Sequence, residues 1–242
     1  MRGLQYHRLD AYTASTYNNS GAGVAELADA ADLKSAGPSP CGFESHPRHQ
    51  LENNMPWLIV ILGYLLGSIP TGYIAGRVFK KVDIRNVGDG NMGAQNAFRQ
   101  LGAGVGIAVG LIDAAKGALA IFIAQVANLP QIAVLLAGAA AVIGHNWPVF
   151  LRFRGGRGEA TTIGVLLVTI TQPMLILAIL AIATLVIWRN VILASAVLFV
   201  PLPLVCWWLG VPGVLIAYGV ALPSLVGFTH FLRTRQAVTH RV

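Results

Sequence analysis

The feature that most constrains this chain is a series of long apolar runs separated by short polar loops. After Met55 seven runs follow one another, at about residues 56–76, 101–127, 132–147, 159–171, 174–188, 191–209 and 211–232. About 20 apolar residues are enough for a helix to cross the hydrocarbon core of a bilayer. Only 11% of the residues are charged, whereas soluble domains carry about 25%. The sequence therefore predicts an all-α, polytopic membrane protein with about seven transmembrane helices.

Residues 1–54 differ in kind from the rest of the chain. They are polar, without a periodic apolar face or the continuous apolar run of a secretion signal. The codons for Gly42 to Ser45 accommodate the T-arm consensus of tRNA genes, and Gly21 to Gln50 spans the length of such a gene. We expect residues 1–54 to be spurious upstream translation, with a disordered tail as the alternative. Residues 55–242 then form one membrane domain.

The basic residues indicate how the spans are oriented. The net charge is +7, and every Lys and Arg after Met55 except Lys116 falls in the first, third or fifth loop or in the C-terminal tail. With seven spans these four segments share one face, which the positive-inside rule makes cytoplasmic. Basic residues confined to short loops favour membrane lipid and phosphate over nucleic acid as the anionic partner. Neither cysteine has a metal-ligand spacing, and no metal site is expected.

The third loop combines arginines with closely spaced glycines. It contains Gly155, Gly156, Arg157 and Gly158, with Thr161 at the start of the next apolar run. Glycines let backbone N–H groups approach an anion, and a guanidinium binds phosphate well. The loop therefore predicts a phosphate site. The alternative is a basic loop that only fixes the membrane topology.

The first loop is rich in side chains that can orient a polar substrate. It contains Arg85, Asp89, Asn91, Asn96 and Arg99, on the same predicted face as the third loop. Asparagine amides can orient a polyol, and an arginine can bind a phosphate in bidentate fashion. The alternative is a flexible connector, because Asn and Gly are common in turns.

Three further groups are candidates with structural alternatives. Asp113 and Lys116 lie three residues apart on one face of the second span, where they line a substrate path or simply neutralise each other. His145 and His230 lie at the predicted membrane face. A single histidine in such a place is a binding group or a hydrogen-bonded structural group.

Two motifs stand out in these loops: GDGNMGAQNAFR, from Gly88 to Arg99, and GHNWPVFLRFRGGRGEAT, from Gly144 to Thr161. They resemble those of the bacterial integral-membrane glycerol-3-phosphate acyltransferases that use acyl phosphate as donor. The resemblance extends from Met55 to about Arg235. It implies a seven-helix fold in the bacterial inner membrane, with the active site and the C-terminus cytoplasmic. It also implies acyl transfer to the 1-hydroxyl of glycerol 3-phosphate, giving lysophosphatidate at the first step of phospholipid synthesis.

The chain departs from the family pattern at several positions. The family usually has Ser at Asp89, Thr or Ser at Gln95, Lys at Arg157 and a small apolar residue at Glu159. A third motif, His followed by Asn-Ile and Arg, survives poorly after His230. A divergent or catalytically inactive paralogue is therefore an alternative to the enzyme.

The expected site assigns a role to each candidate. Asp89, Asn91 and Arg157 are expected to be catalytic, with Asp89 accepting the hydroxyl proton. The expected substrate-binding residues are Arg85, Asn96, Arg99, Lys116, His145, Gly155, Gly156, Gly158, Thr161 and His230. Acyl phosphate, glycerol 3-phosphate and membrane lipids are the expected partners, without a cofactor. The competing function is a membrane carrier of an anionic solute or lipid.

Overall fold

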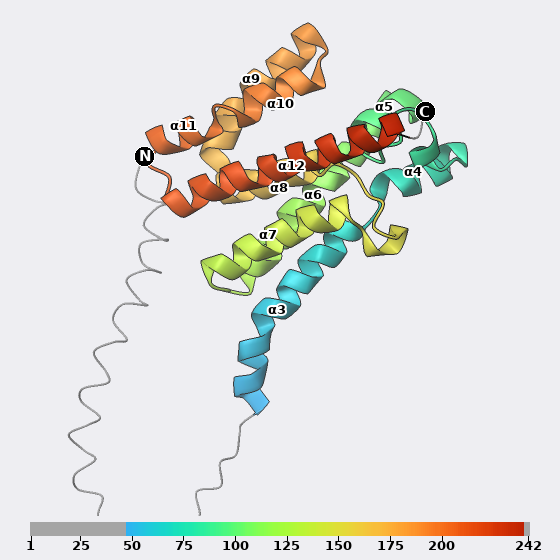
Figure 1. Ribbon diagram of the computed structural model, residues 1–242. Helices are drawn as coiled ribbons and strands as arrows, with labels where there is room; N and C mark the ends of the chain where they lie inside the picture. Colours follow the sequence, from blue (N-terminus) through green and yellow to red (C-terminus); the bar gives the residue numbers. More distant parts are fainter. Residues whose placement is uncertain (1–46, 240–242) are drawn as a thin grey trace, which may run out of the picture. The chain divides into compact units, whose positions relative to one another are not determined.

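The computed structural model describes residues 47–239, with side chains from 55 to 233. Every regular element in this range is helical, as predicted (Figure 1). The elements are α3 (Pro47–Ser68), α4 (Thr71–Lys80), η2 (Ile84–Asn86), α5 (Ala94–Leu101), α6 (Ala103–Val126), α7 (Gln131–Asn146), η3 (Val149–Leu151), α8 (Glu159–Thr169), α9 (Thr171–Trp188), α10 (Val191–Phe199), α11 (Leu202–Trp208) and α12 (Gly213–Thr239). The expectation for residues 1–54 falls almost entirely outside the described residues.

The described residues contain six apolar segments long enough to cross a membrane. They are Met55–Lys80, Ala103–Val126, Gln131–Leu151, Thr171–Trp188, Val191–Trp208 and Gly213–Arg233. A membrane protein is thus confirmed, but a count of seven spans is not. The fourth predicted span corresponds to α8, whose 11 residues extend only about 16 Å against a core of about 30 Å.

Small residues bring the helices together. A Cβ at Gly63 of α3 would lie 2.5 Å from the carbonyl oxygen of Ala137 in α7, and one at Gly67 would collide with that of Ala141. Because lipid tails are as apolar as the helix surfaces, such close backbone approach replaces the hydrophobic effect as the source of helix association. Figure 1 shows α3 and α7 side by side as a result.

Close packing at glycines also joins α6 to α8. A Cβ at Gly117 would collide with the carbonyl oxygen of Thr161, and one at Gly164 would collide with that of Ala114. This packing sets the start of α8 against the middle of α6, where Lys116 lies. The short α8 is thereby held by a spanning helix.

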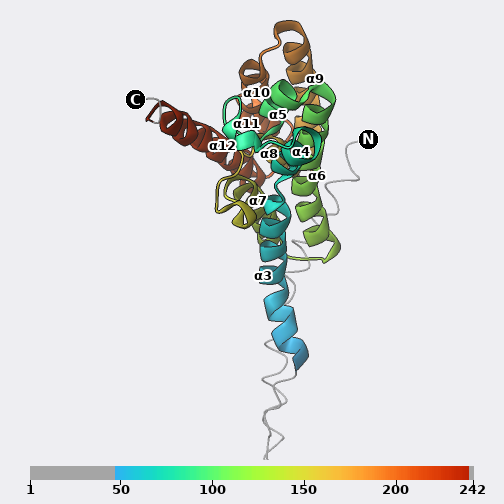
Figure 2. The same ribbon diagram turned by 90° about the vertical axis from the view of Figure 1, so that its right-hand side faces the viewer.

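A break at Pro70 separates the first span into two helices. α3 ends at Ser68 and α4 begins at Thr71, as expected because proline cannot continue the hydrogen-bond ladder. α4 then ends at Lys80, and the residue that caps it, Lys81, takes the left-handed conformation with φ 56°. Figure 2 shows α4 and α5 together at the end that faces the viewer.

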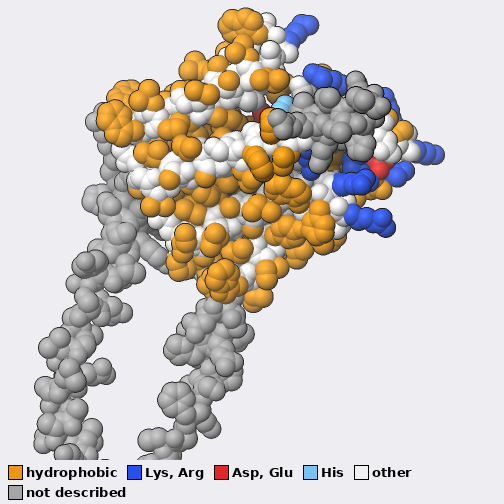
Figure 3. All heavy atoms as spheres, in the orientation of Figure 1, with side chains coloured by type: hydrophobic (Ala, Val, Ile, Leu, Met, Phe, Trp, Pro, Cys, Tyr) orange, Lys and Arg blue, Asp and Glu red, His pale blue; other side chains and the backbone are white. Residues whose placement is uncertain are grey.

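Charged side chains gather at this end. On the face seen in Figure 3, Lys and Arg lie mainly around α4 and α5, and hydrophobic side chains cover most of the rest. Beneath the first loop a small core is formed by Ala75, Ile84, Met92, Ala97, Leu101 and Val109. The first loop, which includes α5, is therefore packed onto α4 and α6.

Candidate active site

The first loop is shaped by the buried amide of Asn96. Its Nδ2 donates to the carbonyl oxygens of Ile84 at 3.1 Å, Val87 at 3.0 Å and Asn91 at 2.8 Å. Its Oδ1 accepts from the backbone N–H of Asp89 at 3.3 Å. With all of its polar atoms bound to loop backbone, Asn96 acts in this structure as a positioning residue.

An ion pair joins the first and third loops. Arg157 Nη2 lies 3.4 Å from Asp89 Oδ2, and these side chains are 18% and 29% exposed. Asp89 Oδ1 accepts from the Asn91 N–H at 3.0 Å, while the buried Asn91 Oδ1 has no partner. The fold thus brings together the three residues expected to be catalytic.

The glycines of the third loop pack against the end of α7. A Cβ at Gly155 would collide with the carbonyl oxygen of His145, and one at Gly156 would collide with its Nε2. The Gly156 N–H donates to that carbonyl at 3.0 Å. The role predicted for these glycines in binding a ligand stays a prediction; the structure shows in addition that both pack against His145 and that the Gly156 N–H is bound to its carbonyl.

Gly158 is required by backbone conformation as well as by space. Its φ is +84°, in the left-handed region, and a Cβ there would collide with Asn146 Oδ1. Gly158 also precedes the first residue of α8, so it sets the direction in which that helix begins. Unpaired N–H groups at such a helix start favour an anion.

A buried polar cluster lies beneath the third loop. Lys116 Nζ is 2.8 Å from Asp113 Oδ1, and His145 Nδ1 is 3.5 Å from the same oxygen. All three side chains are at most 5% exposed. Lys116 Nζ also donates to the Ile69 carbonyl at 2.9 Å. The predicted Asp113–Lys116 pair is confirmed, and His145 joins it.

Several buried polar side-chain atoms around these loops have no hydrogen-bond partner in the structure. Besides Asn91 Oδ1, they are Ser68 Oγ, both polar atoms of the Asn146 side chain, Arg157 Nε, and the hydroxyls of Thr161 and Thr162. Leaving a buried polar atom unpaired costs about 1–3 kcal/mol. A polyhydroxylated or phosphorylated ligand offers suitable hydrogen-bond partners for atoms of this kind.

The last helix contacts the third loop through two residues. Thr229 Oγ1 donates to the Arg157 carbonyl at 3.1 Å, and Arg233 Nη2 donates to the Asn146 carbonyl at 2.7 Å. From the sequence we predicted a role only for His230 in this region. The i, i+4 spacing of Thr229 and Arg233, which places both residues on one face of α12, was the signal that could have identified them. His230 is half-buried beside them.

The two arginines expected to bind substrate in the first loop lie in different surroundings. Arg85 pairs with Asp83 at 2.7 Å and lies over the Tyr73 ring at 5.1 Å from its centroid. The hydrogen bond from Arg85 lowers the pKa of Asp83, and the same bond raises the pKa of Arg85. Arg99 is exposed on α5. Within residues 55–233 no three His, Cys, Asp or Glu side chains are grouped to hold a metal ion.

The fold and the site together define an integral membrane protein with a buried polar centre under basic loops. Comparison with known proteins narrows this class. The family described as glycerol-3-phosphate acyltransferase matches residues 57–240. Glycerol-3-phosphate acyltransferase 4 of Dehalococcoides mccartyi is 54% identical over 182 residues, covering 75% of this chain and 98% of that protein. The Geotalea daltonii glycerol-3-phosphate acyltransferase is 43% identical, covering 72% and 89%.

Solved structures agree with the sequence relatives. The crystal structure of PlsY (YgiH), an integral membrane glycerol 3-phosphate acyltransferase in its glycerol 3-phosphate form, superposes with a TM-score of 0.68 and 32% identity. It covers 77% of this chain and 94% of its own. Its lysophosphatidic acid form gives 0.66 and 31%. The chain belongs to the glycerol-3-phosphate acyltransferase family.

Proposed function

We propose that the chain transfers a fatty acyl group from an acyl phosphate to the 1-hydroxyl of glycerol 3-phosphate, giving lysophosphatidate and phosphate. The observation that carries this proposal is the meeting of both motif loops at Asp89 and Arg157. That ion pair lies next to the buried cluster, because Gly156, the residue before Arg157, packs on the His145 ring of the cluster. Family membership supports the enzyme over the carrier, and a solved relative was crystallised with glycerol 3-phosphate.

The donor requires charge neutralisation more than a strong nucleophile. An acyl phosphate is a mixed anhydride with a good leaving group, so positioning and electrostatic stabilisation supply most of the catalysis. The glycerol hydroxyl oxygen attacks the acyl carbon, the bond from that carbon to the phosphate oxygen breaks, and phosphate leaves. Arg157 pairs with the departing phosphate, and Gly158 and Thr161 contribute the start of α8 and a hydroxyl donor.

The ion pair gives Asp89 a defined part in proton transfer. In this structure Asp89 Oδ2 faces Arg157. When the donor phosphate takes over Arg157, that oxygen is released to accept the proton of the attacking hydroxyl. The proton then passes to the phosphate that leaves, so the enzyme returns to its starting state.

The acceptor is held by the first loop and its neighbours. Arg85 and Arg99 bind the phosphate of glycerol 3-phosphate, and Asn91 orients its hydroxyls through the buried Oδ1 that has no partner. Asn96 keeps Asn91 in place through the bond to its carbonyl. Lys116, His145 and His230 complete the proposed substrate-binding set. We place the enzyme in the bacterial inner membrane, with this site and the C-terminus cytoplasmic.

Alanine substitutions in membranes test the proposed site. Arg157→Ala, Asn91→Ala and Asp89→Ala are each expected to lower acyl transfer about 100-fold or more, because each removes a group that acts on the reacting atoms. Arg154→Ala is the matched control, since Arg154 is an exposed arginine of the same loop. Full activity in all three site variants would refute the proposed catalytic site.

A further inference from the structure

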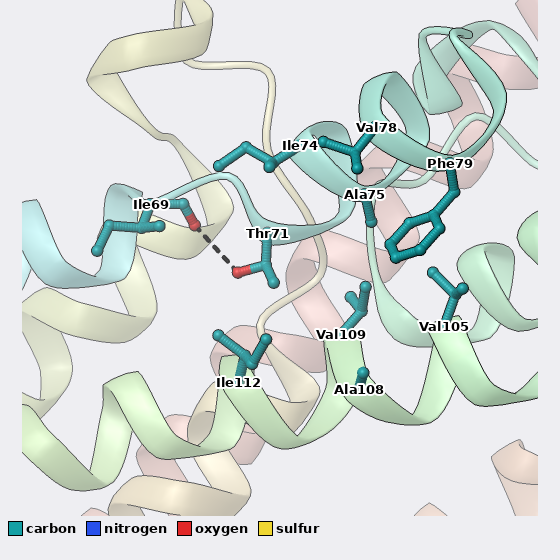
Figure 4. Close-up of a pocket in the computed structure, with 10 residues that line it drawn as sticks. All are labelled: Ile69, Thr71, Ile74, Ala75, Val78, Phe79, Val105, Ala108, Val109 and Ile112. Atoms are coloured by element: carbon teal, nitrogen blue, oxygen red, sulfur yellow. Dashed lines mark hydrogen bonds between the residues drawn. The ribbon is translucent and has the colours of Figure 1, made fainter.

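Phosphate recognition in this protein depends on the loops and on the start of α8. A cavity of about 360 Å³ lies between α4 and α6. Figure 4 shows that apolar side chains line it, and that Thr71, the one polar residue of its lining, is bonded to the Ile69 carbonyl. The cavity therefore offers no charged group to an anion. The groups around the start of α8 decide how strongly a phosphate is held.

The first turn of α8 has the features of an anion site. The Thr162 N–H donates to the Gly158 carbonyl at 2.8 Å and begins the helical ladder. The N–H groups of the three residues before Thr162 have no carbonyl partner within the helix, and Gly158 has no side chain to cap them. The hydroxyls of Thr161 and Thr162 are fully buried and have no partner. The turn thus offers several hydrogen-bond donors to one anion.

A carboxylate lies in the same turn. Glu159 is the first residue of α8 and the acid of its first turn. An acid at this place is attracted to the positive end of the helix dipole and to the same N–H groups that bind a phosphate. Glu159 therefore competes with an anionic ligand unless another group holds its side chain.

Ser195 of α10 engages this carboxylate. Its Oγ donates to Glu159 Oε1, and both side chains are partly buried. Ser195 is the one hydroxyl-bearing residue among the nine of α10. The same Oγ lies 2.8 Å from the Val191 carbonyl oxygen, but a hydroxyl has one hydrogen to donate. Because a hydrogen bond to a carboxylate is about twice as strong as one to a neutral acceptor, Glu159 is the preferred acceptor and Val191 the alternative.

We infer that Ser195 is a positioning residue, which holds the Glu159 carboxylate against α10 and so leaves the start of α8 to the phosphate of the acyl donor. This inference deepens the proposed function and rests on it. Without the hydroxyl, the carboxylate turns toward the N–H groups of its own helix and opposes the binding of phosphate. Ser195 acts through Glu159 and does not contact the reacting atoms.

Removal of the hydroxyl tests this role through phosphate affinity. In full-length protein with palmitoyl phosphate as donor, Ser195→Ala is expected to raise the KM for the donor about fivefold, with kcat within about twofold of the unaltered protein. The inhibition constant of inorganic phosphate is expected to rise by a similar factor. Ser195→Thr keeps the hydroxyl and is expected to keep both constants. Ser224→Ala is the matched control, because the Ser224 hydroxyl donates to the Val220 carbonyl of its own helix at 2.8 Å.

Neutralising the carboxylate separates this role from a structural one. Glu159→Gln keeps the length of the side chain but removes its charge, so the KM for the donor is expected to stay at or below that of the unaltered protein. Adding Ser195→Ala to Glu159→Gln is then expected to change neither the KM nor the inhibition constant.

Three results overturn the inference and leave Ser195 only a structural link between α10 and α8. They are an unchanged KM in Ser195→Ala, an equal rise in KM when Ser195→Ala is added to Glu159→Gln, and a rise in KM in Glu159→Gln alone. Failure of the unaltered protein to use any acyl phosphate refutes the proposed function itself, a result distinct from these three.

Discussion

At the scale of single residues, the centre of this molecule is an ion pair between two positions that depart from the usual family pattern. The resemblance described above led us to expect a serine at the position of Asp89 and a lysine at that of Arg157, and the structure sets the two side chains 3.4 Å apart. An acid in the first loop is thus matched by a guanidinium that can divide its hydrogen bonds between a carboxylate and a phosphate. The acid at position 89 and the arginine at position 157 are therefore explained as the two halves of one ion pair.

Reversing this pair separates its structural role from its role in catalysis. Asp89→Arg and Arg157→Asp are each expected to lower kcat/KM at least about 100-fold. The double variant restores an ion pair between the loops but leaves an acid at position 157, where we propose that phosphate binds. It is therefore expected to recover thermal stability without activity. Activity near that of the unaltered protein in the double variant would show that the pair only joins the loops.

A second residue-scale prediction concerns the Asp83–Arg85 pair at low pH. The hydrogen bond from Arg85 lowers the pKa of Asp83 below 3.8, so its contribution to stability is present above pH 3.8 and is lost as the pH falls through the lowered value. Asp83→Asn is expected to reduce the apparent Tm at pH 7 by no more than about 3 °C, because such pairs contribute at most about 1 kcal/mol. The difference should shrink as the melts are made more acidic and vanish once the pH is below the lowered pKa of Asp83. A difference that persists there would contradict the ion-pair explanation.

At the scale of the elements, glycine-mediated contact between α3 and α7 holds the scaffold of the site. Gly67→Ala is expected to destabilise the protein by about 1–3 kcal/mol, because the new methyl group overlaps the Ala141 carbonyl. Gly104→Ala in α6 is the matched control, since its Cβ would meet no atom within 4 Å. Melting temperatures of the two variants in detergent measure the effect, and equal values would argue against close packing.

The sequence pattern predicted elements better than it predicted their ends. Long apolar runs were sufficient for α6, α7 and α9, because the bilayer demands a minimum length. The run before Gln172 satisfied the same composition rule, yet its helix has only 11 residues. Hydropathy alone does not distinguish a span from a short helix supported by its neighbours, such as α8 against α6.

The site was predictable where it depends on local spacing. The i, i+3 separation of Asp113 and Lys116 predicted their pairing, whereas His145 joins them only because α7 packs beside α6. Asn96 was expected to contact substrate, which stays a prediction, and the structure adds that its amide binds the loop backbone. Gly156 was likewise expected to contact a ligand, and its packing against His145 was not foreseen. The sequence shows which polar groups are present, and only tertiary packing decides which of them already contact other parts of the protein.

At the scale of the whole molecule, the distribution of charge predicts the orientation in the membrane. With Cys41 and Cys206 replaced by Ser and Ala, a single cysteine at Arg154 should react with an impermeant thiol reagent only after the cells are opened. A cysteine at Gln131, at the other end of α7 and exposed, should react in intact cells. The reverse pattern would invert the proposed topology.

The proposed start of the membrane domain leads to a further whole-molecule prediction. The family match begins at residue 57, and the residues discussed for the site all follow Met55. A chain that begins at Met55 is therefore expected to insert and to transfer acyl groups at a rate within about twofold of the full chain, since it keeps the six apolar segments and every residue discussed for the site. Loss of activity on this truncation, with insertion retained, would assign residues 1–54 a role.

The Lys116–Asp113 pair also bears on how the protein is made. A charged side chain near the centre of a span raises the cost of insertion by about 2.5–3.5 kcal/mol, so α6 is a poor candidate to leave the translocon alone. The preceding segment already offers the Ile69 carbonyl, and the following one brings His145. We therefore expect an order in biosynthesis, in which α6 stays beside the preceding segment at the translocon until α7 emerges and the buried cluster can form.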